Sequence, residues 1–160
     1  MGKAIISNYT NDRFYRAVGV LTINATFLKS GWEFVYFNTL NMKFDDKILD
    51  LSFRELIKLV RREIHSKTFV NPEAKRKLLK LADKSIELNS KRNTKIHASI
   101  LGGGNEFYIR ERKNKIRTME LLDDTKIKEI EDICDEIAKQ GRIIHEISYE
   151  KEYYKLKTKE

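Results

Sequence analysis

Residues 71–104 read NPEAKRKLLKLADKSIELNSKRNTKIHASILGGG, and this stretch decides the fold prediction. Its beginning carries the signals of a helix N-terminus. Asn71 can cap the first turn, Pro72 suits the first helical position, and Glu73 adds an acid where the helix dipole is positive. Apolar residues then recur at three- and four-residue spacing, which indicates one buried face. Because a run of three glycines follows, we expect one long helix from Asn71 to about Leu101.

Three further stretches show the same helical periodicity. We expect a first helix from about Thr10 to about Leu40, a second from Ser52 to about residues 65–67, and a last helix beginning near Asp124. The second opens on the sequence Ser-Phe-Arg-Glu, a capping box in which the serine and glutamate side chains satisfy each other's free backbone amides.

The chain between the third and last helices differs in pattern. At about residues 105–122, two short apolar runs flank a polar centre, which is typical of a short β-hairpin or a loop insert. The tail, about residues 150–160, alternates charge with tyrosine and is expected to fray. We therefore predict an all-α fold, a four-to-five-helix up-and-down bundle with this insert, formed by residues 1–160 as a single domain.

The composition of the 160 residues limits the class of protein. The chain has one cysteine, Cys134, which excludes an internal disulfide and falls on the apolar stripe of the last helix, so we expect it in the core. No signal-peptide core is visible at the N-terminus. The most apolar long stretch, Phe14 to Leu40, is interrupted by Arg16 and Lys29, among others. We therefore expect a cytoplasmic protein without a membrane span.

The formal net charge is +8 at pH 7. A basic surface attracts polyanions at long range, and nucleic acid is the commonest polyanion inside cells. The alternative is that the lysine excess only keeps the chain soluble. The charge therefore favours RNA or DNA as a partner without establishing either.

One histidine stands in a pattern that suggests chemistry. Of the three histidines, only His97 follows an arginine at a distance of five residues, and that arginine, Arg92, is followed directly by Asn93. Histidine is the side chain that moves protons most readily near neutral pH. The planar fork of arginine binds phosphate oxygens at two points, and an asparagine can orient either partner. These three residue types therefore suit the cleavage of a phosphodiester.

The Arg-Asn-x-x-x-His pattern, late in a helical chain, resembles the HEPN superfamily (higher eukaryotes and prokaryotes nucleotide-binding domains). The resemblance implies a HEPN-type helical bundle and a metal-independent endoribonuclease that cleaves single-stranded RNA by attack of the ribose 2′-hydroxyl, without a cofactor. It also implies roles: His97 as general acid and base, Arg92 as phosphate binder and Asn93 as orienting residue. By the same resemblance, the setting would be phage defence or a toxin–antitoxin system, with an antitoxin or regulatory protein as a partner.

One position departs from a subtype of this family. Some HEPN toxins carry a tyrosine two residues after the histidine, where a partner antitoxin modifies it, whereas this sequence has Ser99. The departure argues against that regulated subtype.

Helical geometry predicts how the motif is assembled. Asn93 and His97 are four residues apart and share a helix face, whereas Arg92 lies roughly 140° around the helix from His97. One helix does not bring all three together. We therefore expect a homodimer in which each protomer contributes an arginine and a histidine to a shared cleft, which is also how HEPN nucleases are usually built.

Basic and aromatic residues near the motif are predicted to contact RNA, because cations follow phosphates and rings stack on bases. They are Lys91, Lys95, Tyr108, Arg110, Arg112, Lys113, Lys115 and Arg117. The other histidines, His65 and His145, show no zinc-ligand spacing with Cys134, so we expect no metal site.

Two other readings of the sequence stay open. The chain could be a non-catalytic HEPN-like helical dimer that binds RNA or a protein partner as an adaptor, inhibitor or regulator. It could also be a structural helical dimer that uses the aromatic-rich end of its first helix. Cleavage, binding without cleavage, and absence of RNA affinity distinguish the three.

Overall fold

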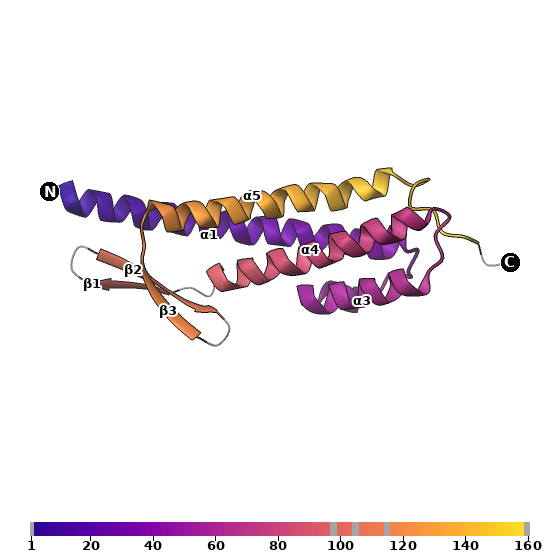
Figure 1. The fold of residues 1–160 in the computed structure, drawn as a ribbon, viewed down its shortest axis with the longest axis horizontal. Coiled ribbons are helices and arrows are strands. Elements are labelled where there is room, and N and C mark those ends of the chain that lie inside the picture. The colour runs from indigo at the N-terminus through magenta and orange to yellow at the C-terminus, as the bar shows by residue number, and fades with distance from the viewer. Residues whose placement is uncertain (1, 97–98, 104–105, 114–115, 159–160) are drawn as a thin grey trace.

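The computed structural model describes the backbone of residues 2–96, 99–103, 106–113 and 116–158, and the side chains of residues 12–96 and 122–158. The molecule is an elongated bundle in which the long helices α1 (Gly2–Phe34), α4 (Pro72–Ile96) and α5 (Asp124–Glu146) run side by side (Figure 1). The shorter helix α3 (Phe53–Ser66) covers only the part of α4 that is far from the sheet. The predicted mainly helical fold is confirmed.

The helices do not simply alternate in direction along the chain. The chain leaves α1 through a π-helical turn, η1 (Val35–Thr39), and then runs back along the bundle through the one-turn helix α2 (Asp46–Leu49) before α3 begins. As a result α1 and α3 run in the same direction, and α4 runs opposite to both (Figure 1). The alternation expected of an up-and-down bundle therefore starts only at α3.

Local capping chemistry fixes where three helices begin. Ser52 and Glu55 form the predicted capping box at the start of α3. The Asn71 side chain accepts a hydrogen bond from the amide of Glu73 at 3.0 Å, and Asp123 caps α5 by accepting from the amide of Lys126 at 2.9 Å. Each bond satisfies an amide that the helix itself leaves without a partner.

The end of α4 differs from the prediction. The helix ends at Ile96 instead of continuing to about Leu101, because residues Ser99–Gly103 form a strand, β1. Ile100 pairs with Ile109 across the ladder. A β-branched residue followed by glycines is compatible with a strand as well as with a helix end, so the apolar spacing alone could not separate the two.

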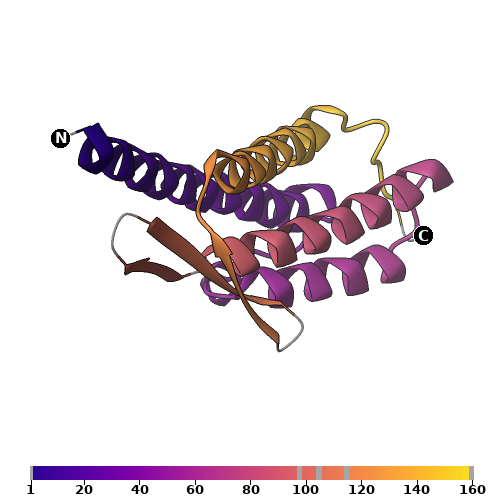
Figure 2. The ribbon, with the colours of Figure 1, turned by 60° about the vertical axis from the view of Figure 1, so that its left-hand side comes forward.

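The insert is a three-stranded antiparallel sheet in the order β1-β2-β3, with β2 at Glu106–Lys113 and β3 at Ile116–Leu121. It therefore contains the predicted hairpin and one strand more. Figure 2 shows the sheet beside the end of α4, and Figure 1 shows that α3 does not extend along α4 as far as the sheet.

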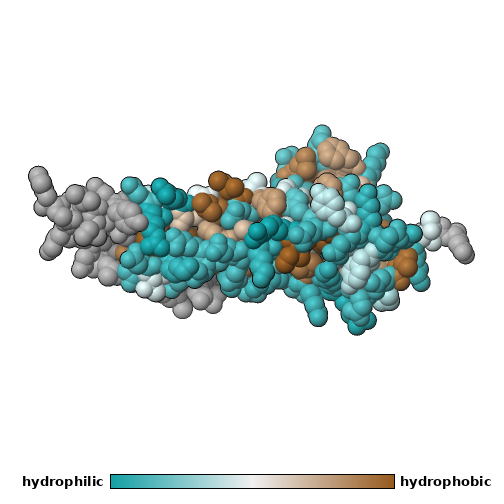
Figure 3. Space-filling view, turned by 90° about the horizontal axis from the view of Figure 1, so that it is seen from above, coloured by the Kyte–Doolittle hydropathy of each residue, from teal (hydrophilic) through white to brown (hydrophobic). Residues whose placement is uncertain are grey.

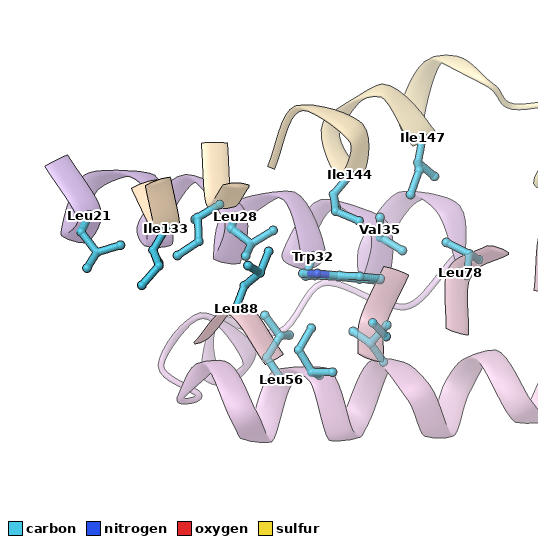
Figure 4. Close-up of a cluster of buried hydrophobic side chains, with 14 of the residues drawn as sticks. Leu21, Leu28, Trp32, Val35, Leu56, Leu78, Leu88, Ile133, Ile144 and Ile147 are labelled. Carbon is cyan, nitrogen blue, oxygen red and sulfur yellow. The ribbon is translucent and has the colours of Figure 1, made fainter. Parts of the chain in front are cut away.

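A hydrogen-bonded junction lies at the centre of the core. The Trp32 indole donates to the Ser85 hydroxyl at 3.0 Å, and the Gln140 amide donates to the same hydroxyl at 3.2 Å and to the carbonyl of Leu81 at 3.0 Å. Trp32 and Ser85 are fully buried. Figure 4 shows the Trp32 ring with Val35 and Ile144 on one side and Leu56 and Leu88 on the other. One junction thus joins α1, α4 and α5.

Two glycines let α1 and α5 approach closely. A Cβ atom on Gly141 would lie 2.7 Å from Cδ1 of Phe27, and one on Gly31 would lie 3.0 Å from Cγ2 of Ile144. The Phe27 ring stacks on His145 with 4.2 Å between ring centroids. Cys134 also packs here, as predicted: it is buried, and burial raises the pKa of its thiol to about 11.

The tail is more ordered than predicted. Tyr154 is buried, and Leu156 forms an isolated β-bridge with Phe69. The amide of Val70 donates to the carbonyl of Lys155, and the amide of Lys157 donates to the carbonyl of Thr68, both at 2.8 Å. The expected fraying of residues 150–160 is therefore wrong for 153–157, because this segment completes the connection between α3 and α4.

The surface seen in Figure 3 is mostly hydrophilic, and hydrophobic side chains interrupt it in separate patches. On α1, Ile23 is 68% exposed, and Val20 and Phe27 are also exposed. Among the residues described, none of the helices has the length and apolar character that crossing a bilayer requires.

Replacing Ser85 tests the central junction. Ser85→Ala removes the acceptor of a buried indole N–H, so we expect the free energy of unfolding to fall by about 1–3 kcal/mol in urea denaturation. Ser90→Ala, on the exposed side of the same helix, should change it by less than about 0.5 kcal/mol. Equal effects of the two substitutions would contradict the junction's role.

Replacing glycines tests the spacing of α1 and α5. In a helix, Gly→Ala alone stabilises by about 1 kcal/mol. Gly19→Ala should show this gain, because its Cβ would meet nothing within 4 Å. Gly141→Ala should instead destabilise by about 1–2 kcal/mol, since the new methyl group displaces the Phe27 ring. Similar thermal midpoints for the two variants would show that the helices are not held at this distance.

Candidate functional site

The motif arginine is half-buried and lies on the core-facing side of α4. Arg92 follows Ser85 by seven residues, close to two helical turns, so both point to the same side of the helix. Leu88 precedes it by four residues, and Ile96 follows it by four. Leu88 is fully buried and Ile96 is packed against the core. Arg92 therefore continues the core-facing line toward the end of α4.

The guanidinium of Arg92 is only partly satisfied. Its Nη1 donates to the Asn93 side-chain oxygen at 2.9 Å. Its Nε is buried and has no hydrogen-bond partner, and no carboxylate pairs with Arg92 in the described part of the chain. Burial lowers the pKa of the guanidinium, which still stays far above neutral pH. Among the described side chains, the buried Nε therefore has no group that offsets its loss of hydration.

A second buried cation one turn later is paired. Lys95 is 8% exposed, and its Nζ lies 3.2 Å from the carboxylate of Glu129 on α5. Lys126 also binds this carboxylate, at 3.3 Å. Burial raises the pKa of Glu129, but the hydrogen bonds from the two lysines outweigh it and hold that pKa below its usual value. Among the described side chains, Lys95 thus has an acidic partner and Arg92 has none.

Lys91 also faces carboxylates. Its ammonium lies 3.0 Å from Glu87 and 3.7 Å from Glu136, and the hydrogen bond with Glu87 raises the pKa of Lys91. The charges of Lys91 and Lys95 are therefore locally compensated, and their RNA contacts stay a prediction.

The remaining predicted residues lie in or beside the sheet. His97 and Lys115 fall outside the described residues. The backbone of β2 and β3 carries the others, and its register places Arg110 between Ser99 and Met119, and Arg112 opposite Arg117. The residues predicted to bind RNA that lie on these two strands are Tyr108, Arg110, Arg112, Lys113 and Arg117.

The sheet follows directly on the motif. Strand β1 begins at Ser99, two residues after His97, and β2 packs beside α4. Figure 2 shows the sheet crossing the end of α4. The structure thus brings the basic insert next to the helix end that carries Arg92 and Asn93.

Sequence reasoning missed two features of this site. The burial of Arg92 had a signal, since Leu88, Arg92 and Ile96 continue one four-residue spacing. The pairing of Lys95 with Glu129 had none, because 34 residues and a sheet separate them along the chain.

The chain matches no protein-family model, no curated protein and no solved structure.

Replacing Arg92 distinguishes a functional cation from a structural one. Arg92→Met keeps a long side chain and removes a half-buried charge that no described carboxylate pairs, so we expect the free energy of unfolding to stay unchanged or to rise by up to about 1 kcal/mol. Leu88→Ala, one turn earlier on the same face, should lower it by about 2–5 kcal/mol and shows that this region is sensitive. A loss of about 2 kcal/mol in Arg92→Met would make the arginine a structural contact.

Proposed function

We propose that this chain is a metal-independent endoribonuclease of the HEPN type that cleaves single-stranded RNA. The observation that carries the proposal is Arg92, a cation on the core-facing line of α4 whose buried Nε has no partner among the described side chains. Such a group contributes nothing evident to the fold. It is available for a phosphate oxygen, and perturbed or uncompensated charges of this kind concentrate at functional sites.

The chemistry follows from the residue types. The ribose 2′-hydroxyl loses its proton to a base and attacks the adjacent phosphorus. The bond from phosphorus to the 5′-oxygen breaks, and that oxygen takes up a proton. The products are a 2′,3′-cyclic phosphate and a 5′-hydroxyl. In the proposal, His97 moves the protons and Arg92 stabilises the charge on the phosphorane.

The hydrogen bond between Asn93 and Arg92 supports the orienting role of the asparagine. Because Nη1 already donates to Asn93, the guanidinium plane is held, and a phosphate would meet a preoriented group. A nearby carboxylate would compete for the same group, and the described residues place none on Arg92. This arrangement suits the binding of an anion from outside the chain.

The proposed active species is a homodimer with a composite site, the arrangement that the resemblance implies. Each protomer would supply Arg92 to a cleft shared with the partner's histidine. By the resemblance, an antitoxin or regulatory protein would control it in phage defence or a toxin–antitoxin system.

A non-catalytic role is the second candidate, and the net charge of +8 favours it. A HEPN-like dimer could bind RNA or a protein as an adaptor, inhibitor or regulator without cleaving. In that case the insert would make most of the contacts with the RNA or protein partner, and Arg92 would contribute one further contact.

RNA cleavage in the presence of EDTA tests the proposal. Wild type should cleave single-stranded RNA and leave cyclic-phosphate ends, and His97→Ala and Arg92→Met should each lose at least about 100-fold in rate. His65→Ala is the matched control, since His65 is exposed at the end of α3. Cleavage that persists in His97→Ala would overturn the mechanism. RNA binding without cleavage in wild type would establish the second candidate.

A further inference from the structure

A cavity of about 610 Å³ lies at the end of the bundle opposite the sheet. The end of α1 and the turn η1 contribute part of its lining, and the 3-10 turn η2 (Ile147–Tyr149) and the tail contribute the rest. Its apolar floor includes the buried side chains of Ile147 and Tyr154. The volume falls within the range of about 300–1,000 Å³ that small-molecule sites occupy.

Irregular backbone gathers around this cavity. The π-helical turn η1 supplies Asn38 and Thr39 to the lining, and η2 supplies Tyr149. Asn41, also in the lining, has φ of 53°, which non-glycine residues rarely adopt. π-Helical turns and left-handed residues cost free energy relative to regular helix, and they concentrate at functional sites.

The lining is cationic. Lys151 and Lys155 both contribute to it, and no carboxylate does. Lys155 lies 3.3 Å from Glu152, an exposed pair of little strength, and Lys151 forms no ion pair within residues 12–96 and 122–158. The neighbouring Glu150 is directed to Lys77 on α4, at 3.4 Å. The cavity therefore attracts an anion.

Two aromatic rings border the same cavity. Tyr149 is 87% exposed and Phe34 is 43% exposed, so both rings leave much of their surface to solvent. Exposed rings beside lysines are the usual arrangement for stacking bases and holding the phosphates of a single strand. The side chain of Asn41 is exposed at the rim and carries a donor and an acceptor for base edges.

From these observations we propose that the cavity is an accessory site for single-stranded RNA, which holds one base against Tyr149 and Phe34 and its phosphate against Lys151 and Lys155. The site is separate from Arg92. The tail that lines it pairs with residues 68–70, just before α4 begins, and Arg92 lies 20 residues beyond Pro72, about 30 Å at 1.5 Å per residue. The inference does not rest on cleavage, because a chain that only binds RNA would use it equally.

Binding of a fluorescein-labelled oligouridylate to the full-length chain tests this site. All variants carry His97→Ala, so that the probe stays intact. Tyr149→Ala should weaken binding at least about fivefold, since stacking on one ring is worth about 1–3 kcal/mol. Lys151→Gln should weaken binding and make the slope of log K against log salt shallower by about 0.7, the value for one phosphate of a single strand.

Matched controls lie on other surfaces. Tyr15→Ala removes a ring that is 60% exposed on α1, and Lys80→Gln removes an exposed charge on α4. Both should bind the probe with affinity within about twofold of the parent. Unchanged affinity in Tyr149→Ala and Lys151→Gln, or equal losses in the controls, would overturn the site.

A free nucleotide offers the same chemistry, and calorimetry separates the two sources. We expect uridine 5′-monophosphate to bind at least about 100-fold more weakly than the oligomer, because several phosphates contribute to strand binding. If the monophosphate and the oligomer bind with equal affinity, and Tyr149→Ala abolishes the binding of both, the occupant is a free nucleotide. That result would overturn the proposal of a single-strand site. If the wild-type chain does not cleave RNA but still binds the oligomer in a way that depends on Tyr149, the proposed nuclease activity is rejected. The accessory RNA site then stands.

Discussion

The alignment of the bundle depends on one buried hydroxyl. Ser85 accepts hydrogen bonds from Trp32 on α1 and from Gln140 on α5, and it donates to the carbonyl of Leu81 within its own helix. Apolar side chains tolerate small shifts of one helix along another, but an indole N–H or an amide in the core must find its acceptor. The same alignment determines the direction of Arg92, because that residue follows Ser85 by two turns on one face of α4. The position of the candidate site is thus a consequence of core packing.

Two cations near the end of α4, Arg92 and Lys95, differ in the groups that their charges contact. Lys95 pairs with Glu129, and the attraction between the two charges roughly offsets the hydration free energy that Lys95 loses by burial. Arg92 has a neutral partner, Asn93, and its buried Nε has no partner within residues 12–96 and 122–158. A chain under selection for stability alone would carry an apolar residue at this point of the face, as it does at Leu88. Such local conflicts between fold and residue type are expected where function sets the residue.

Much of the fold could be predicted because its signals are local. The helix starts can be predicted because their capping hydrogen bonds join residues that are close in sequence. These bonds involve Ser52 with Glu55, Asn71 with Glu73, and Asp123 with Lys126. The end of α4 could not be predicted this way, since Ile100 suits a strand as well as a helix and only its pairing with Ile109 decides. The ordered structure of the tail could not be predicted from nearby residues either, because it depends on the bridge between Leu156 and Phe69, which lies 87 residues earlier. In the site, the motif identified Arg92 and Asn93, whereas the acid that pairs with Lys95 comes from a distant helix.

The bridge between Phe69 and Leu156 also bears on the order in which the protein folds. In the connection between α3 and α4, Thr68 and Val70 form backbone hydrogen bonds with Lys157 and Lys155. During synthesis these residues leave the ribosome long after both helices have emerged. The two helices can pair early, as contacts close in sequence form fastest, but their connection stays open until residues 155–157 have also emerged. The closing of this bridge is therefore a late step of folding on the ribosome.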